Sequence, residues 1–240
     1  MAEHTNSTVE PNIGFVGLGV MGEPMCLNLA KKTRSKVIGF DLFPDPLERL
    51  AEEGVARAES LEYLADQCEL IFLSLPDGEA VKSVCCRPDG LVAHMKASST
   101  LVDMSTSPVG LTRELAAQCQ ERHIDFADAP VARTREAAIR GDLSVMVGCD
   151  ATLFDRLLPV LKLMGSDVTH CGEVGSGQIM KILNNMVLFQ NVCALTEAIA
   201  VARRNSVNLD TLLSVLSKGS GDSFALRNHG IKSMLPRIFP

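Results

Sequence analysis

Short apolar runs alternate with amphipathic stretches along the first two thirds of the chain. The apolar runs have strand length and occupy residues 12–19, 36–41, 70–76, 100–105, 124–130, 143–148 and, more weakly, 166–172. Most of them are continuous rather than alternating, which is typical of strands buried on both faces of a parallel sheet. Repeated strand–helix alternation of this kind predicts a Rossmann-type, doubly wound α/β fold.

Amphipathic periodicity between and after these runs predicts the helices. They are expected at residues 21–32, 46–53, 61–67, 79–86, 108–122, 151–163, 209–217 and 224–234. Residues 178–204 contain neither proline nor glycine, so we expect one long helix of about 177–204. We therefore predict an α/β domain over residues 12–173. An all-helical second domain follows over residues 174–240, and the long helix joins the two.

Composition and charge narrow the function classes. The 240 residues are 46% hydrophobic and 22% charged, as in ordinary globular proteins. A net charge of −6 without a basic patch argues against nucleic-acid binding. We expect no membrane association, because the apolar runs are shorter than a membrane span and the first residues resemble no signal or transit peptide. Eight cysteines without a C-x-x-C pair predict reduced thiols, no metal site and a cytoplasmic location.

The first apolar run ends in a glycine turn that opens the first predicted helix. Gly17 permits a tight turn, Gly19 lets the backbone approach a pyrophosphate, and Gly22 lets helix and strand pack closely. The start of the helix offers free N–H groups and its positive dipole end to phosphates. All six residues of the turn are therefore candidate cofactor-binding residues: Gly17, Leu18, Gly19, Val20, Met21 and Gly22. A purely structural turn is the alternative.

Asp41 ends the second predicted strand, at the position where an acidic residue binds ribose hydroxyls in dinucleotide-binding proteins. Its charge would repel a 2′-phosphate, and neither Leu42 nor Phe43 provides a guanidinium to bind one. We therefore expect NAD rather than NADP.

Two further runs end in candidate residues. Leu75, Pro76 and Asp77 lie at the end of the run at 70–76, and Ser105 and Thr106 lie at the end of the run at 100–105. Ligands bind at the carboxyl ends of strands in open α/β sheets, so these are candidate ligand residues. Turn chemistry explains them equally well.

Lys181 lies near the start of the long helix, with Asn184 and Asn185 three and four positions later. This spacing places both amides beside the amine on a helical face. A lysine at the edge of a cleft can exchange a proton with a carbonyl or alcohol oxygen during hydride transfer. The alternative is a solvated surface lysine. Apolar neighbours, Ile179, Ile182, Leu183 and Val187, are expected to bury part of the helix.

The chain is similar to the β-hydroxyacid dehydrogenase family, which includes 3-hydroxyisobutyrate dehydrogenase, tartronate semialdehyde reductase and relatives of 6-phosphogluconate dehydrogenase. Four blocks carry the resemblance in the family's order: GLGVMGEPMCLNL (17–29), VDMSTSP (102–108), DAPV followed by GDLSVMVG (128–131 and 141–148), and GSGQIMKILNN (175–185). The resemblance extends over nearly the whole chain from residue 13 onward.

The resemblance implies a function and residue roles. Lys181 would be the general acid/base, Asn184 and Asn185 would hold the substrate together with Ser105, and Leu75, Pro76 and Thr106 would line the nicotinamide side. The implied reaction is reversible hydride transfer between NAD and a short anionic hydroxy acid or semialdehyde. Family members continue with further helices, so the second domain is expected to be incomplete. Its exposed apolar helices predict a homo-oligomer, a dimer or tetramer.

One block departs from the family pattern. Ala132-Arg133-Thr134 stands where the family has Ser-Gly-Gly, and it is similar to the Gly-Arg-Thr of the sulfolactaldehyde reductase branch. Arg133 and Thr134 are therefore candidate substrate residues, since a guanidinium can bind an anion through two parallel hydrogen bonds. The alternative is a solvated turn, in which Arg133, Arg135, Glu136 and Arg140 form surface ion pairs.

Two other functions compete with the dehydrogenase. One is a catalytically silent dinucleotide-binding module that acts in assembly, and the other is an imine reductase. Silent relatives lose the lysine and imine reductases generally depart from it, so the presence of Lys181 argues against both.

Overall fold

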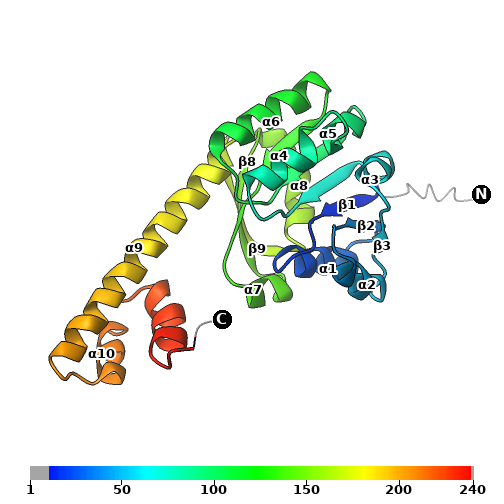
Figure 1. The fold of residues 1–240 in the computed structure, drawn as a ribbon. Coiled ribbons are helices and arrows are strands. Elements are labelled where there is room, and N and C mark those ends of the chain that lie inside the picture. Colours follow the sequence, from blue (N-terminus) through cyan, green and yellow to red (C-terminus); the bar gives the residue numbers. More distant parts are fainter. Residues whose placement is uncertain (1–10, 239–240) are drawn as a thin grey trace, which may run out of the picture. The chain divides into compact units, whose positions relative to one another are not determined.

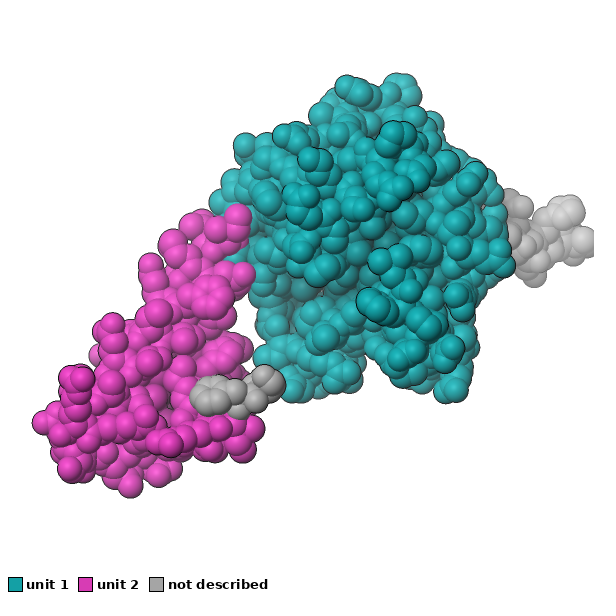
Figure 2. Space-filling view, viewed as in Figure 1, with its two compact units in different colours: residues 1–181 teal, residues 182–240 magenta. Residues whose placement is uncertain are grey.

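The structure is a computed structural model that describes residues 11–238 (Figure 1). The chain falls into two compact units, residues 1–181 and 182–240 (Figure 2). Helix α9 (Ser176–Arg204) runs through the division, and the last strand of the sheet ends at Gly172. We keep the predicted domain boundary between residues 173 and 174 as a proposal, because it separates the sheet from this helix.

The first unit contains a mostly parallel sheet with helices on both faces (Figure 1). Its strands are β1 (Ile13–Val16), β2 (Val37–Phe40), β3 (Ala56–Arg57), β4 (Leu70–Leu73), β5 (Thr100–Asp103), β6 (Asp125–Asp128), β7 (Val131–Ala132), β8 (Leu143–Gly148) and β9 (Gly165–Gly172). Its helices are α1 (Gly22–Lys32), α2 (Pro44–Ala51), α3 (Leu61–Gln67), α4 (Gly78–Cys85), α5 (Leu91–His94), α6 (Val109–Glu121), α7 (Arg135–Arg140) and α8 (Ala151–Leu161).

The strand order is β3-β2-β1-β4-β5-β6-β8-β7, and β9 pairs with β8. The pairs from β3 to β6 are parallel, whereas β8 runs antiparallel to β6 and β7. The order reverses between β1 and β4, which is where doubly wound sheets bind ligands at the carboxyl ends of their strands. The glycine turn follows β1 at this switch point. The predicted α/β fold class is therefore confirmed.

Two apolar clusters hold the helices on the sheet. Residues of α1, α2, α7 and α8 pack with Phe15 and Phe72 on one face, and residues of α3, α4, α5 and α6 pack with Ile71 and Leu101 on the other. Each of these four strand residues is completely buried. The strands therefore read as continuous apolar runs because both of their faces are covered.

The sequence missed four short elements and one helix type. β3, α5, β7 and α7 are at most six residues long, too short for periodicity to distinguish them from turns. The helix expected at 224–234 is a π-helix over Leu226–Met234. Apolar spacing cannot tell a π-helix from an α-helix over so few turns.

The second unit, residues 182–240, has a small core of its own. Leu195 and Ile199 of α9 pack with Leu213 of α10 (Leu209–Leu216) and with Leu226 of the π-helix. The four residues predicted to bury α9 near Lys181 are instead 38–51% exposed. That expectation was wrong, because the core of this unit lies further along the helix.

Within residues 11–238, α9 is the one helix that is long and apolar enough to cross a membrane by length and composition alone. No such run was expected from the sequence, because polar residues such as Lys181, Asn184 and Glu197 interrupt it. One helix of this kind is weak evidence for a span, since core helices also meet the criterion.

Asp128 ties the start of α9 to the sheet. Its two carboxylate oxygens accept the backbone N–H groups of Gly175, at 2.7 Å, and Gln178, at 2.8 Å. The Gln178 side chain then bonds to the segment after β5, accepting from Ser107 N at 3.1 Å and donating to Ser105 O at 2.9 Å. Both side chains are fully buried. The ends of β5 and β6 therefore fix where α9 begins.

The Asp128→Asn variant tests this anchor. It replaces one acceptor oxygen with an NH₂ group that faces a backbone N–H. We expect the free energy of unfolding to fall by about 1–3 kcal/mol, the usual cost of a buried group left without a partner. Urea denaturation at neutral pH measures this loss.

Asp125→Asn is the matched control at the other end of β6. The Asp125 side chain is 44% exposed and pairs with Arg156, so its loss should cost less than about 1 kcal/mol. Equal losses in the two variants would contradict the anchoring role of Asp128.

Candidate dinucleotide and catalytic site

The three glycines of the turn after β1 differ in what a side chain at each position would meet. Gly17 has a φ of +89°, and a Cβ there would lie 2.3 Å from the carbonyl oxygen of Ser74. A Cβ on Gly22 would lie 1.9 Å from the carbonyl oxygen of Gly17. A Cβ on Gly19 would meet no atom within 4 Å. Gly17 and Gly22 are thus required by the fold, whereas Gly19 adjoins open space that a phosphate could enter.

Asp41 is held next to this turn. One oxygen of its carboxylate accepts the N–H of Leu18 at 2.6 Å, and the other accepts the N–H of Phe43 at 2.9 Å. Each carboxylate oxygen has a second lone pair, so the group can still accept hydroxyl donors. The acid predicted to bind ribose therefore also fixes the turn.

A cavity of about 500 Å³ joins the glycine turn to Asp41. This volume is typical of small-molecule sites. Leu18, Gly19, Val20, Glu23, Asp41, Phe43, Pro44, Asp45, Pro46, Arg49 and Arg135 line it. The 11-residue helix α1 begins beside it, with the positive end of its dipole at this N-terminus. Space at Gly19, a helix start and a fixed carboxylate together fit the phosphate and ribose groups of a dinucleotide.

The residues after β4 and β5 are joined to each other. The hydroxyl of Ser105, which is 4% exposed, accepts the N–H of Leu75 at 2.9 Å. Asp77 accepts the N–H of Ala80 at 2.8 Å and caps α4. Pro76 and Thr106 are exposed. Turn chemistry thus accounts for the side chains of Ser105 and Asp77, and their ligand roles stay predictions.

Burial shifts the pKa values of ionisable groups around the start of α9. Burial raises the pKa values of Asp103 and Asp128, although the hydrogen bonds that they accept lower them in part. Burial also lowers the pKa of Lys181 from the ordinary lysine value of 10.5. Lys181 is half-buried, so it is not the fully solvated lysine of the alternative interpretation. A lowered pKa suits a proton donor that must also act as a base.

The two asparagines lie further along α9. Asn184 is exposed and donates to the side chain of Asn185 at 3.4 Å, whereas Asn185 is half-buried. Because Lys181, Asn184 and Asn185 belong to one helix, their spacing of three and four residues matches the predicted face.

Arg133 forms ion pairs with two carboxylates in this structure. Its guanidinium donates to Asp142 Oδ1 at 3.1 Å and to Ser166 Oγ at 3.0 Å, and it forms a second ion pair with Asp167. Its φ of +89° lies in the region that favours glycine. Thr134 is exposed, directly before α7, and makes no side-chain cap bond. The structure therefore shows the surface ion pairs of the alternative interpretation, and binding of an anion would compete with them.

Sequence reasoning proposed only four of the eleven cavity residues, and the ones that it missed include three charged residues from three helices. Glu23, Arg49 and Arg135 come from α1, α2 and α7, and only the tertiary structure brings them together. The sequence suggests Arg135 only for the alternative interpretation, as one of the surface ion-pair residues around Arg133. Gln178 was missed as well, since only its buried bonds reveal its role.

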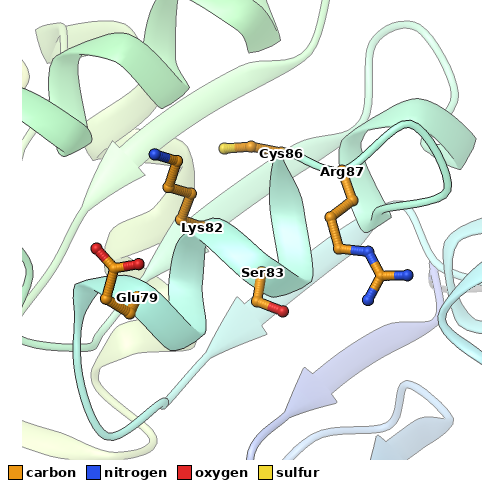
Figure 3. Close-up of a pocket in the computed structure, with 5 residues that line it drawn as sticks. All are labelled: Glu79, Lys82, Ser83, Cys86 and Arg87. Carbon is orange, nitrogen blue, oxygen red and sulfur yellow. The ribbon is translucent and has the colours of Figure 1, made fainter.

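A second hollow, of about 290 Å³, lies on α4 (Figure 3). Glu79, Lys82, Ser83, Cys86 and Arg87 line it, and none of them is a predicted site residue. Burial raises the pKa of the Cys86 thiol, which opposes thiolate chemistry there. No group of three or more potential metal ligands occurs among the described residues.

Comparison with known families gives the assignment. Residues 12–172 match the model described as the NAD binding domain of 6-phosphogluconate dehydrogenase. Residues 175–240 match the model described as NAD-binding of NADP-dependent 3-hydroxyisobutyrate dehydrogenase. The chain belongs to the β-hydroxyacid dehydrogenase family. It is thus an NAD(P)-binding dehydrogenase, and the fold and family expected from its four blocks are confirmed.

Individual β-hydroxyacid dehydrogenases match along most of the chain. The 2-(hydroxymethyl)glutarate dehydrogenase of Eubacterium barkeri is 35% identical over 89% of this chain and 71% of its own length. The 3-hydroxyisobutyrate dehydrogenase of Pseudomonas aeruginosa is 36% identical over 90% of this chain and 72% of its own length. The chain therefore spans about seven tenths of the length of these relatives.

Solved structures show the same likeness. The Mycobacterium tuberculosis 3-hydroxyisobutyrate dehydrogenase with L-serine has a TM-score of 0.84 and 32% identity, covering 91% of this chain and 74% of its own. An imine reductase variant of Myxococcus stipitatus with NAD⁺ has a TM-score of 0.80 at 17% identity, covering 95% of this chain and 76% of its own. The second likeness shows the fold alone.

The Gly19→Ala variant separates phosphate binding from turn structure. The added methyl group enters open space at a residue without positive φ, so we expect the unfolding midpoint to change by less than about 2 °C. The Kd for NADH should rise at least about tenfold, because the methyl group occupies space near the pyrophosphate. Titration of NADH fluorescence or calorimetry measures the Kd.

Gly110→Ala in α6 is the control, since a Cβ there also meets no atom within 4 Å. Wild-type affinity for NADH in the Gly19→Ala variant would leave the glycine turn with a structural role only.

Proposed function

We propose that the chain catalyses reversible hydride transfer between NAD and a short hydroxy acid that carries a carboxylate or similar anion. The main support is Lys181, a half-buried lysine with a lowered pKa in a chain of the β-hydroxyacid dehydrogenase family. The product of oxidation is the corresponding aldehyde or semialdehyde. Relatives named for hydroxyacid substrates, at 35–36% identity, favour this reaction over the silent module and the imine reductase.

NAD rather than NADP is the proposed cofactor. Asp41 supports this choice, because its charge would repel a 2′-phosphate while its free lone pairs would accept ribose hydroxyls. The exposed ring of Phe43 gives the cavity an apolar rim for the adenine. The bound nicotinamide supplies the hydride chemistry. The glycine turn, residues 17–22, positions the phosphates, and Leu75, Pro76, Asp77 and Thr106 are proposed to line the nicotinamide side.

Lys181 is proposed to move the proton. In reduction its ammonium donates a proton to the carbonyl oxygen of the substrate, and in oxidation its neutral amine accepts the hydroxyl proton. Asn184, Asn185 and Ser105 supply donors and acceptors for the substrate's oxygens. Arg133 and Thr134 are proposed to meet its anionic group, which requires Arg133 to exchange Asp142 or Asp167 for the substrate.

Location and assembly belong to the same proposal. We keep a cytoplasmic location and a homo-oligomer, dimer or tetramer, as predictions. The exposed apolar residues of α9 support association, including Met186, Val187 and Phe189, which are 47–64% exposed.

The Lys181→Ala variant tests the proton transfer. We expect kcat to fall by ~10²–10⁴ with little change in KM, because the amine acts in the transition state. Absorbance of NADH with a panel of C3 and C4 hydroxy acids measures both constants. Lys162→Ala removes an exposed lysine and should leave them unchanged. Near-wild-type turnover in Lys181→Ala would remove Lys181 from the mechanism.

The pH dependence follows from the direction of the shift. Reduction needs the ammonium form, and the pKa of Lys181 is lowered from 10.5. The reduction rate should therefore fall, and the oxidation rate rise, as pH increases through a value below 10.5. Profiles of kcat against pH in both directions measure this.

The Arg133→Gly variant tests the anion contact. Glycine removes the guanidinium and accepts the φ of +89°, so the fold should lose less than about 1 kcal/mol. We expect KM for the hydroxy acid to rise about tenfold with kcat changed less than about threefold, because the contact exists in ground and transition states alike. Arg140→Ala, which also removes a partner of Asp142, is the control. An unchanged KM in Arg133→Gly would make Arg133 a surface ion-pair residue only.

A further inference from the structure

The wall of the dinucleotide cavity has more charged side chains than the one acid that binding a ribose requires. Three carboxylates line it, those of Glu23, Asp41 and Asp45, together with the guanidinium groups of Arg49 and Arg135. Its fixed charge is therefore one unit negative. Arginines are the side chains best suited to bind a phosphate, so their presence in a cavity proposed to prefer NAD needs a physical explanation.

Glu23 engages one of these arginines. Arg49 Nε donates to Glu23 Oε1 at 2.7 Å and Nη2 donates to Oε2 at 2.9 Å, the two parallel bonds that a phosphate would also take. The bonds from Arg49 lower the pKa of Glu23, so the carboxylate stays ionised. The guanidinium fork of Arg49 thus faces an acid of the same cavity, and their charges cancel.

Arg135 is the second guanidinium. It begins α7, on a segment far from Glu23 in sequence, and its charge also contributes to the lowered pKa of Glu23. Glu23 therefore offsets the field of both arginines, through bonds to Arg49 and through space to Arg135.

We infer that Glu23 determines the choice between NAD and NADP by occupying Arg49. With the carboxylate in place, a 2′-phosphate meets three acids and finds the guanidinium fork of Arg49 occupied. Without it, the phosphate can take the two bonds that Arg49 now gives to Glu23, with Arg135 adding positive charge. This inference rests on the proposed dinucleotide site.

Glu23 is better placed than Asp41 to set this preference. Asp41 holds the N–H groups of Leu18 and Phe43, so its replacement would disturb the turn itself. The side chain of Glu23 bonds to Arg49, whose side chain is 58% exposed, and supports no backbone group. Its charge can therefore change with little effect on the fold.

The test is the ratio of the Kd values for NADPH and NADH, measured by calorimetry on the full chain without substrate. In Glu23→Gln the ratio should shift at least about tenfold towards NADPH, the effect of roughly one charge-assisted hydrogen bond. In Glu23→Gln/Arg49→Ala the shift should disappear. The shift in Glu23→Gln should also be smaller at about 300 mM salt than at about 50 mM salt, because these charges are partly solvated.

Glu48→Gln is the matched control. It removes the same charge from the residue next to Arg49, but Glu48 does not line the cavity. An unchanged ratio in Glu23→Gln, an equal shift in Glu48→Gln, or a shift that persists without Arg49 would overturn the inference. Tight NADH binding by the wild type would leave the proposed function standing in those cases. Failure of the wild type to bind either dinucleotide would overturn both.

Discussion

The pair of hydrogen bonds that Asp128 accepts from Gly175 and Gln178 connects the two halves of the proposed chemistry. The sheet positions the dinucleotide cavity, and α9 positions Lys181. Asp128 ends β6, so its carboxylate fixes the first turn of α9 to the carboxyl edge of the sheet. Gln178 adds bonds to the segment after β5, one helical turn before Lys181. A buried carboxylate is costly unless donors surround it, and here backbone donors do so.

Two carboxylates at the dinucleotide cavity likewise bind neighbouring groups of the chain. Asp41 accepts two backbone N–H groups that shape the glycine turn, and it keeps lone pairs for a ribose. Glu23 accepts two bonds from Arg49 and so determines what that arginine can bind. In each case the carboxylate accepts hydrogen bonds from neighbouring groups of the chain and also lines the site proposed for the ligand. The charge pattern of the cavity is consequently part of the fold and not an addition to it.

The block that departs from the family pattern holds its arginine through ion pairs with neighbouring acids. Arg133 has a positive φ, a backbone conformation that favours glycine. Ion pairs with Asp142 and Asp167 hold the arginine there. Two residues later, Arg135 lines the dinucleotide cavity. One short segment thus lies between the proposed substrate contact and the cofactor site.

The sequence by itself determined the seven longer strands and the glycine turn and proposed Asp41 and Lys181 as site residues, because hydrophobic periodicity and residue spacing act over short distances along the chain. It also gave the family, through four ordered blocks. Only the tertiary structure decided which charges share a cavity, since Glu23, Arg49 and Arg135 come from three helices that are brought together by packing. It likewise revealed the anchor at Asp128 and the ion pairs of Arg133. Those interactions join residues separated by 9 to 50 positions, and no local pattern encodes such pairings.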